Sequence, residues 1–378
     1  MVLRVGVVGG GQLARMMVPA AIELGLDIRV LAEGPGMSAA IAASAEGDYH
    51  DAATVLAFAR DVDVVTFDHE HVPQEVLRRL VDAGVAVRPG PAALDVAQDK
   101  ITMRTRLSEL GLPVPDWAAV RDQTELARFL AAHGGRAVVK TARGGYDGKG
   151  VRVVRDAGEA DDWFTALAET GTDEALLAEE LVPFTRELAQ SVARRPSGEV
   201  VAWPLVETVQ RDGVCAEVIA PAPRSAGRLA DAAESTAVRI AEELDVTGVL
   251  AVELFQTDDE RILINELAMR PHNTGHWTID GATTSQFEQH LRAVLDLPLG
   301  ATGALAPVSV MVNVLGGPLD GDLAARYPAA LDAFPEAKYH FYGKAPRPGR
   351  KIGHVTVTGE DVDDVVYRAR AAAAHFDD

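Results

Sequence analysis

Two glutamates on neighbouring stretches of the chain are spaced so that they could hold a cation together. Glu253 and Glu266 lie in "GVLAVELFQTDDERILINELAMR" (248–270), which predicts a β-hairpin with "TDDE" as a four-residue turn. That turn would set Glu253 opposite Ile264 and Glu266 opposite Ala251. The two carboxylates would then share one face of the hairpin as diagonal neighbours, about 7 Å apart at the backbone.

This pairing of carboxylates points to a divalent metal. Two carboxylates that face the same way inside an apolar hairpin repel each other and lose hydration, and a cation between them removes both penalties. Carboxylate oxygens completed by phosphates are typical ligands of Mg²⁺. Asn265 would point to the opposite face of a regular strand, so it is the weaker candidate. Arg270 follows Glu266 by four residues, and the alternative is that one carboxylate reaches solvent or pairs with Arg270.

A glycine-rich stretch, "RGGYDGKG" (143–150), suggests a loop that covers a polyphosphate. Four glycines within seven residues exceed what two paired strands need, and a flexible flap whose N–H groups close over phosphates would use them. Lys140 and Lys149 would supply positive charge. The alternative is an ordinary mobile hairpin.

The first glycine cluster, "VVGGGQLARM" (7–16), has two interpretations. Gly9, Gly11 and Ala14 fit the G-x-G-x-x-G/A pattern between a strand and a helix, and Glu33 follows Ala14 by 19 residues. On these residues alone a nicotinamide dinucleotide site is one interpretation. Another phosphate at the same helix N-terminus, or tight packing of strand against helix, is equally compatible.

Two short basic segments near the C-terminal end of the chain indicate anion pockets. "RPHNTGHW" (270–277) gathers an arginine, two histidines and an asparagine around a glycine, and "PRPGRKIGH" (346–354) adds two arginines and a lysine. Because the chain has a formal net charge of −20, local cations must hold any anionic ligand.

The elements that must position these residues form an α/β front, a mixed α+β middle and a β-rich end. Apolar strands at 2–9, 27–33 and 63–70 alternate with helical spacing at 11–25 and 73–84, which predicts a doubly wound parallel sheet for about the first 95 residues. Further strands precede and follow the flap, and a long amphipathic helix spans 229–246.

Bulk composition excludes several classes of protein. The acidic charge disfavours a broad nucleic-acid surface, and no apolar run reaches membrane-spanning length. We expect no signal segment, because "MVLRVGVVGG" reads as a strand from its start, and a single cysteine, Cys215, excludes an internal disulfide. We therefore expect a cytoplasmic protein with no nucleic-acid or membrane partner.

Taken in order, these segments resemble the ATP-grasp superfamily and, within it, the family of 5-(carboxyamino)imidazole ribonucleotide synthases. The resemblance rests on "GGGQLARM", "TFDHEHVP", "AQDK", "KTARGGYDGKG", "AEELVPFTRE", "VLAVELF", "INELAMRPHNTGHWT" and "PGRKIGH". It implies a Rossmann-like pre-ATP-grasp domain (1–96), an ATP-grasp domain (97–300) with a lid subdomain near 115–185, and a small β-rich C-terminal domain (301–378).

The resemblance also implies a role for individual residues. Glu253 and Glu266 would bind Mg²⁺, and Arg270, His272, Asn273 and Lys351 would act on bicarbonate or its activated form. ATP would contact Lys100, Lys140, Gly145, Tyr146, Asp147, Gly148, Lys149, Gly150, Val151, Glu179, Glu180, Leu181, Val182, Glu187, Gln210, Asn265 and Glu266. The ribonucleotide would lie among Gly11, Gln12, Leu13, Glu70, Tyr146, Asp147, Arg350 and Lys351. Gln210 departs from the family, which often has histidine there, and Met269 replaces a frequent proline.

The activity implied by the resemblance is a carboxylation. ATP and bicarbonate would convert 5-aminoimidazole ribonucleotide to its N5-carboxylated form through carboxyphosphate, in purine biosynthesis, by a homodimeric ligase. One alternative is another ATP-grasp ligase, such as a formate-dependent glycinamide ribonucleotide transformylase or a biotin-carboxylase-like enzyme. The distant alternative is a nicotinamide-dependent oxidoreductase, which needs neither the flap nor the paired glutamates.

Overall fold

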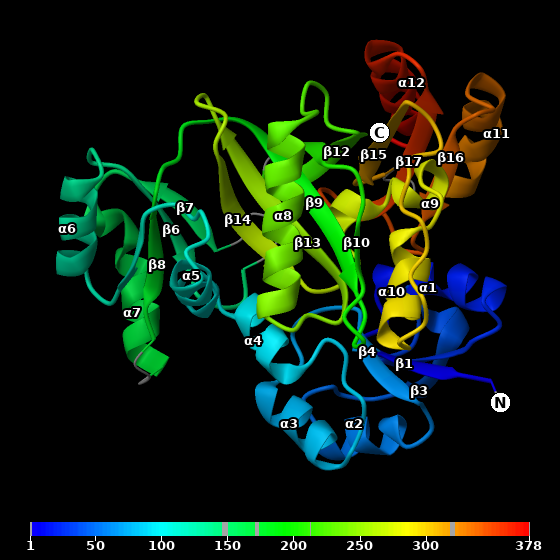
Figure 1. Ribbon diagram of the computed structural model, residues 1–378, viewed down its shortest axis with the longest axis horizontal. Helices are drawn as coiled ribbons and strands as arrows, with labels where there is room; N and C mark the ends of the chain where they lie inside the picture. Colours follow the sequence, from blue (N-terminus) through cyan, green and yellow to red (C-terminus); the bar gives the residue numbers. More distant parts are fainter. Residues whose placement is uncertain (1, 146–149, 171–173, 212, 318–321, 378) are drawn as a thin grey trace.

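Three β-sheets organise the part of the chain that the computed structural model describes, which is residues 2–145, 150–170, 174–211, 213–317 and 322–377. In Figure 1 the large antiparallel sheet occupies the middle of the molecule, the small four-stranded sheet lies to its left and the N-terminal sheet lies below it. Tyr146, Asp147, Gly148 and Lys149 of the predicted flap lie outside the described residues.

The N-terminal sheet is parallel, with the order β3-β2-β1-β4, and confirms the doubly wound front. Its strands are β1 (Arg4–Val8), β2 (Asp27–Ala32), β3 (Ala43–Glu46) and β4 (Val64–Phe67). Its helices are α1 (Gln12–Glu23), α2 (Ala52–Ala59), α3 (Gln74–Asp82) and α4 (Pro91–Gln98), with the 3₁₀ turn η1 (Ala40–Ala42). The sequence did not predict β3 or α2, because "ASAE" carries no apolar alternation and "AATVLAFA" is apolar nearly all round.

The second sheet is antiparallel, with the order β5-β8-β6-β7. It comprises β5 (Trp117–Val120), β6 (Ala137–Thr141), β7 (Val151–Val154) and β8 (Leu176–Glu180), with helices α5 (Lys100–Glu109), α6 (Gln123–Ala132) and α7 (Asp161–Thr170) and the turn η2 (Ala157–Ala160). β6 and β7 pair on either side of the glycine-rich stretch, as predicted, so Lys140 lies opposite Val151.

The large sheet is antiparallel throughout and has nine strands within the described residues. Its order is β14-β13-β9-β11-β12-β15-β17-β16, and β10 pairs with β9. The strands are β9 (Phe184–Arg194), β10 (Val200–Ala202), β11 (Val206–Arg211), β12 (Val214–Ala220), β13 (Gly248–Thr257), β14 (Ile262–Ala268), β15 (Val308–Leu315), β16 (Lys338–Phe341) and β17 (Lys351–Gly359). Because β15 pairs with β12, the strands of segment 301–378 extend the sheet of segment 97–300.

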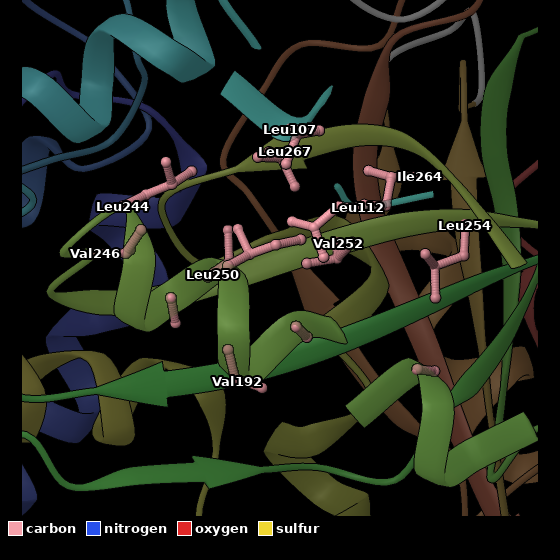
Figure 2. Packing of buried hydrophobic residues seen from close by; sticks show 14 of the residues in the cluster. Leu107, Leu112, Val192, Leu244, Val246, Leu250, Val252, Leu254, Ile264 and Leu267 are labelled. Carbon is pink, nitrogen blue, oxygen red and sulfur yellow. The ribbon is translucent and has the colours of Figure 1, made fainter. Parts of the chain in front are cut away.

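Helices cover the large sheet and complete its core. They are α8 (Arg228–Glu243), α9 (Thr278–Gly281), α10 (Gln286–Val294), α11 (Leu323–Ala333) and α12 (Val362–Ala374), with the turn η3 (Asn273–Gly275). Figure 2 shows the apolar core in which Leu250, Val252 and Leu254 of β13 meet Ile264 and Leu267 of β14. No described helix combines the length and the apolar character that crossing a membrane would require.

The β13–β14 hairpin differs from the predicted register. The turn has three residues rather than four: the backbone N–H of Thr257 donates across the hairpin to the carbonyl of Arg261 at 3.0 Å, and Glu260 adopts a left-handed backbone with φ 61°. A β-bulge then follows, because Leu254 pairs with Ile264 while Glu253 pairs with Glu266. The predicted pairing of Glu253 with Ile264, and of Glu266 with Ala251, is therefore wrong.

Candidate active site

A single large cleft brings most of the predicted residues together. Its cavity volume is about 1510 Å³, and strands of the small and the large sheets line it together with α1 and the segment that follows β4 of the N-terminal sheet. The predicted residues that line it are Gln12, Leu13, Glu70, Lys100, Lys140, Gly145, Val151, Glu179, Glu180, Leu181, Val182, Glu187, Gln210, Glu253, Asn265, Glu266, Arg270, His272, Asn273, Arg350 and Lys351. Gly11 and Gly150 are described but do not line it.

The two glutamates of the hairpin face one another directly in this cleft. Glu253 pairs with Glu266 in the register of β13 and β14. The pKa of Glu253 is raised to about 7, first because the surrounding protein displaces water and then because Glu266 and Glu187 repel its negative charge. Glu266 is partly balanced, since its Oε1 lies 3.2 Å from Lys100 Nζ. The pair therefore carries negative charge that a bound cation would neutralise.

The β-bulge also brings Asn265 into the cleft, where a regular strand would have turned it away. Its Oδ1 accepts a hydrogen bond from Lys140 Nζ at 3.3 Å. Lys140 in turn lies 2.6 Å from Glu179 Oε2, so β6, β8 and β14 meet at one lysine. The reason for ranking Asn265 below Glu266, a regular alternation along β14, does not hold in the structure.

Arg104 completes this cluster and was missed in the sequence. It is fully buried on α5, where it donates to the carboxylate of Glu179 and, at 2.6 Å, to the backbone carbonyl of Asn265. A signal existed, because Arg104 stands beside Met103 and three residues before Leu107, both buried core residues. A charge on the apolar face of a helix requires a buried partner.

The side chain of Glu179 is thus held inside the protein. It is only 3% exposed, and Arg104 and Lys140 offset the cost of burying it, so its pKa is lowered despite that burial. The predicted contact of Glu179 with adenine or ribose stays a prediction. Because the side chain of Glu179 is engaged by Arg104 and Lys140, such a contact would use the backbone of Glu179.

The segment that joins β8 to β9 borders one end of the cleft. Residues 181–183 belong to neither strand, and Phe184 stacks on Phe255 with ring centroids 4.6 Å apart and planes 9° from parallel. Burial raises the pKa of Glu187, which lines the same end. Backbone outside a sheet, apolar rings and a carboxylate are the features that a purine nucleoside needs.

The first glycine cluster is explained by packing against two carboxylates. Asp68 Oδ1 accepts from Ala14 N at 2.7 Å, and a Cβ at Gly11 would lie 2.0 Å from Asp68 Oδ2. Glu33, the acidic residue of the dinucleotide pattern, accepts from Gly10 N at 2.9 Å. These carboxylates take two of the N–H groups that a dinucleotide pyrophosphate would use.

The neighbouring side chains at this end of the cleft are polar and basic. Gln12 accepts a hydrogen bond from Lys344, which also lines the cleft. Lys344 was not predicted from the sequence, although the segment "KAPRPGRK" contains four cations that could have indicated it. Arg350 and Lys351 line the same region. Glu70, from the end of β4, accepts from Arg270 Nε at 2.7 Å and from Met269 N at 3.1 Å.

The turn that follows β14 presents a set of donors. Arg270, His272 and Asn273 line the cleft together, and His272 Nε2 lies 3.7 Å from Glu253 Oε1. Burial, with Arg270 and Lys351 nearby, lowers the pKa of His272 well below its usual value, so the ring is neutral. The buried Nδ2 of Asn273 makes no hydrogen bond to a nitrogen or oxygen atom of the described residues, and its sulfur neighbour, the Cys215 thiol, accepts only weakly, so this donor can serve an oxyanion.

Models of known families match the chain in three consecutive parts. A ribonucleotide synthetase preATP-grasp domain matches residues 2–98, an ATP-grasp domain matches residues 105–287, and a phosphoribosylaminoimidazole carboxylase C-terminal domain matches residues 309–368.

Relatives match over nearly the whole chain. N5-carboxyaminoimidazole ribonucleotide synthase of Mycobacterium tuberculosis is 52% identical over 373 residues, covering 98% of this chain and 86% of the relative. The enzyme of the same name from Corynebacterium ammoniagenes is 51% identical over 376 residues, covering 98% and 91%.

Solved structures of enzymes with this name are similar to the chain over nearly its whole length. The synthetase from Thermus thermophilus superposes with a TM-score of 0.85 at 39% identity, covering 98% of this chain and 97% of that one. The synthase from Aspergillus clavatus, in complex with ADP and 5-aminoimidazole ribonucleotide, superposes with a TM-score of 0.88 at 31% identity, covering 99% and 98%.

Proposed function

This chain belongs to the N5-carboxyaminoimidazole ribonucleotide synthase family, and on that premise we propose how its cleft works. It is an ATP-grasp carboxylate–amine ligase that uses ATP to carboxylate 5-aminoimidazole ribonucleotide to the N5-carboxyamino product in purine biosynthesis. The observation that carries the residue assignment is the facing pair Glu253 and Glu266, set between lysines on one side and the donors of the 270–273 turn on the other.

The reaction requires bicarbonate to become an electrophile. A bicarbonate oxygen attacks the γ-phosphorus of ATP, the bond to the β-phosphate oxygen breaks, and carboxyphosphate and ADP form. The exocyclic amine then bonds to the carbon of carboxyphosphate, directly or through CO₂ released in the cleft. Phosphate leaves and carries the proton that the amine gives up. Each step develops charge on oxygen, which positioned donors stabilise.

The cleft divides this work between two sets of side chains. Lys100 contacts Glu266 of the acidic pair, Lys140 contacts the adjacent Asn265, and both lysines would contact the phosphates of ATP. Arg270, His272 and Asn273 would hold bicarbonate, and the buried Nδ2 of Asn273, which makes no hydrogen bond to nitrogen or oxygen among the described residues, supports that role. The ribonucleotide would lie between Gln12, Leu13, Glu70, Arg350 and Lys351, which come from α1, the segment after β4 and the residues around the start of β17.

We also propose that Glu253 and Glu266 hold Mg²⁺. Their direct pairing, and the pKa of about 7 that this crowding gives Glu253, fit a site built for a cation. Groups of three or more histidine, cysteine, aspartate or glutamate side chains with metal-binding geometry are absent from the described residues. Two carboxylates completed by phosphate oxygens suit Mg²⁺. When bound, the ion would neutralise charge on the β- and γ-phosphates.

Phosphate release tests the proposal and separates the alternatives. Release should require both bicarbonate and 5-aminoimidazole ribonucleotide. If formate and glycinamide ribonucleotide support it instead, the chain is a different ATP-grasp ligase. Mg-ATP should raise the melting temperature and NADH should not; stabilisation by NADH alone would favour the oxidoreductase interpretation.

A cytoplasmic homodimer remains our expectation for the working enzyme. A buried, unpaired Cys215 supports a reducing compartment. The mass of the enzyme in solution, measured by light scattering, tests the dimer.

A further inference from the structure

Gln286, at the start of α10, holds the turn that presents the bicarbonate-binding residues. Its Oε1 accepts from His272 N at 2.8 Å, and its Nε2 donates to His272 O at 2.8 Å. A backbone N–H only donates and a carbonyl only accepts, so the two ends of the amide are fixed. Gly275 is required here, because a Cβ at that position would lie 2.4 Å from Gln286 Oε1.

The fixed amide determines where the proton of His276 resides. The second N–H of Gln286 Nε2 faces His276 Nδ1 at 2.8 Å. Nδ1 must accept this bond, so the neutral ring carries its proton on Nε2. Protonation of Nδ1 would set two donors against each other and break the contact with Gln286.

The surroundings of His276 also oppose a charged ring. Burial is the main cause that lowers the pKa of His276 to about 3, and Lys351, His340 and Arg270 add repulsion. The ring also packs against His354, with centroids 5.0 Å apart, and His354 is itself kept neutral by burial. Two further rings that contact His276, those of Phe287 and Tyr342, are uncharged.

His276 lies at the cleft with the residues that would bind bicarbonate. It lines the cavity together with Arg270, His272, Asn273 and Lys351, although its side chain is almost wholly buried. We propose that His276 is a further catalytic residue, whose Nε2–H donates a hydrogen bond to an oxygen of bicarbonate and of the carboxyphosphate formed from it. Gln286 is the positioning residue that keeps this donor available. This inference rests on the proposed function.

A neutral imidazole suits this position chemically. An imidazolium would protonate bicarbonate or carboxyphosphate and release CO₂ early, whereas a neutral N–H stabilises negative charge and keeps its proton. Neutral histidines that polarise an oxygen are known where the surroundings depress the pKa. The same N–H then serves both halves of the reaction, because no proton moves through it.

The first test reads the tautomer of the wild-type protein and needs no substrate. Nitrogen-15 NMR of histidine-labelled protein should show His276 neutral and protonated at Nε2 from pH 5 to 9. His290 provides an internal reference, because its Nδ1 accepts from Val249 N at 3.1 Å and its Nε2 lies 2.8 Å from Thr66 Oγ1. Gln286→Glu should move the His276 proton to Nδ1, since a carboxylate only accepts. A proton on Nδ1 in the wild type overturns the inference.

The second test measures catalysis in two variants. His276→Met removes the donor and should lower kcat for bicarbonate-dependent phosphate release about 100-fold, with KM for ATP unchanged. His276→Gln can accept from Gln286 and donate into the cleft, so it should recover to within about tenfold of wild type. His290→Gln, matched for burial, should leave kcat unchanged.

The outcomes separate this inference from the proposed function. Absence of bicarbonate-dependent release in the wild type refutes the function itself. Normal release by the wild type together with unaltered kcat in His276→Met refutes only the inference. If His276→Met does not fold, His276→Gln is compared with His276→Asn, whose shorter amide cannot span both partners. His276→Gln should retain more activity, and equal activities of the two variants would refute the inference.

Discussion

Replacing Glu253 by glutamine should stabilise the metal-free protein while abolishing its activity. Glu253 faces Glu266 directly, and its side chain is 25% exposed within the cleft. Glutamine has nearly the same shape and no charge, so it removes the repulsion and the cost of desolvation without leaving a cavity. A metal ligand is expected to behave in this way, because its charge destabilises the protein without metal and is needed for turnover when the metal is bound.

The size of the effect follows from the pKa of Glu253. It is raised from the ordinary 4.5 to about 7, so the folded state holds the proton more tightly than the unfolded state does. The stability associated with this group is complete below pH 4.5 and is lost as the pH rises through 7. That difference corresponds to at most about 3 kcal/mol, which the partial exposure of the carboxylate reduces to about 2 kcal/mol.

Urea unfolding in EDTA at pH 5 and pH 8 measures this contribution. The variant and the wild type should be nearly equal in stability at pH 5, and the variant should be more stable by about 2 kcal/mol at pH 8. Saturating Mg-ATP should reverse the order, because a ligand at 100 times its Kd stabilises by about 2.7 kcal/mol and the variant has lost a ligand group. Glu234→Gln, at an exposed position on α8, should change none of these values. A variant that is less stable than wild type at pH 8 without metal would refute the reasoning.

Three further substitutions test other parts of the cleft. Arg104→Met should destabilise by about 3–5 kcal/mol in urea unfolding, because it removes one of the two cations that offset the burial of the Glu179 carboxylate. Adding Glu179→Gln should recover part of that loss, and strictly additive effects would contradict the pairing. Lys140→Met should raise KM for ATP about 10- to 100-fold in steady-state assays, and an unchanged KM would remove Lys140 from the phosphate site. Gly11→Ala should lower stability by about 1–3 kcal/mol in thermal unfolding, since the new Cβ collides with Asp68, and an Asp68→Ser background should relieve it if packing is the cause.

Patterns within single elements could be read from the sequence. Alternating apolar strands and helices at the front predicted a parallel sheet, and the hairpin around residues 257–261 was found where expected. The register of this hairpin was not predicted correctly, because a left-handed Glu260 shortens the turn and the bulge at Asn265 adds a residue to β14. Neither feature leaves a clear mark on the sequence, since the turn lacks the glycine that usually occupies that conformation.

Interactions between distant segments could be predicted only in part. The lysines and glutamates of the cleft were recognised by type, but their partners depend on how separate sheets meet. Arg104 contacts Glu179 and Asn265, which lie 75 and 161 residues further along the chain. Asp68 likewise occupies the start of α1 from the end of another strand, which no local pattern reveals.

The cleft has one wall fixed within the nine-stranded sheet and another on the separate four-stranded sheet. Glu253, Glu266 and Lys351 stand on strands of the same nine-stranded sheet, so hydrogen bonds hold their spacing from β14 across to β17. Lys140 belongs to the four-stranded sheet and touches the fixed wall through Asn265 alone among its hydrogen bonds in the described chain. A rigid rotation of the smaller sheet would therefore leave the acidic pair and Lys351 undisturbed while changing the reach of Lys140. The separation between Lys140 Nζ and Asn265 Oδ1, 3.3 Å here, would report any such rotation.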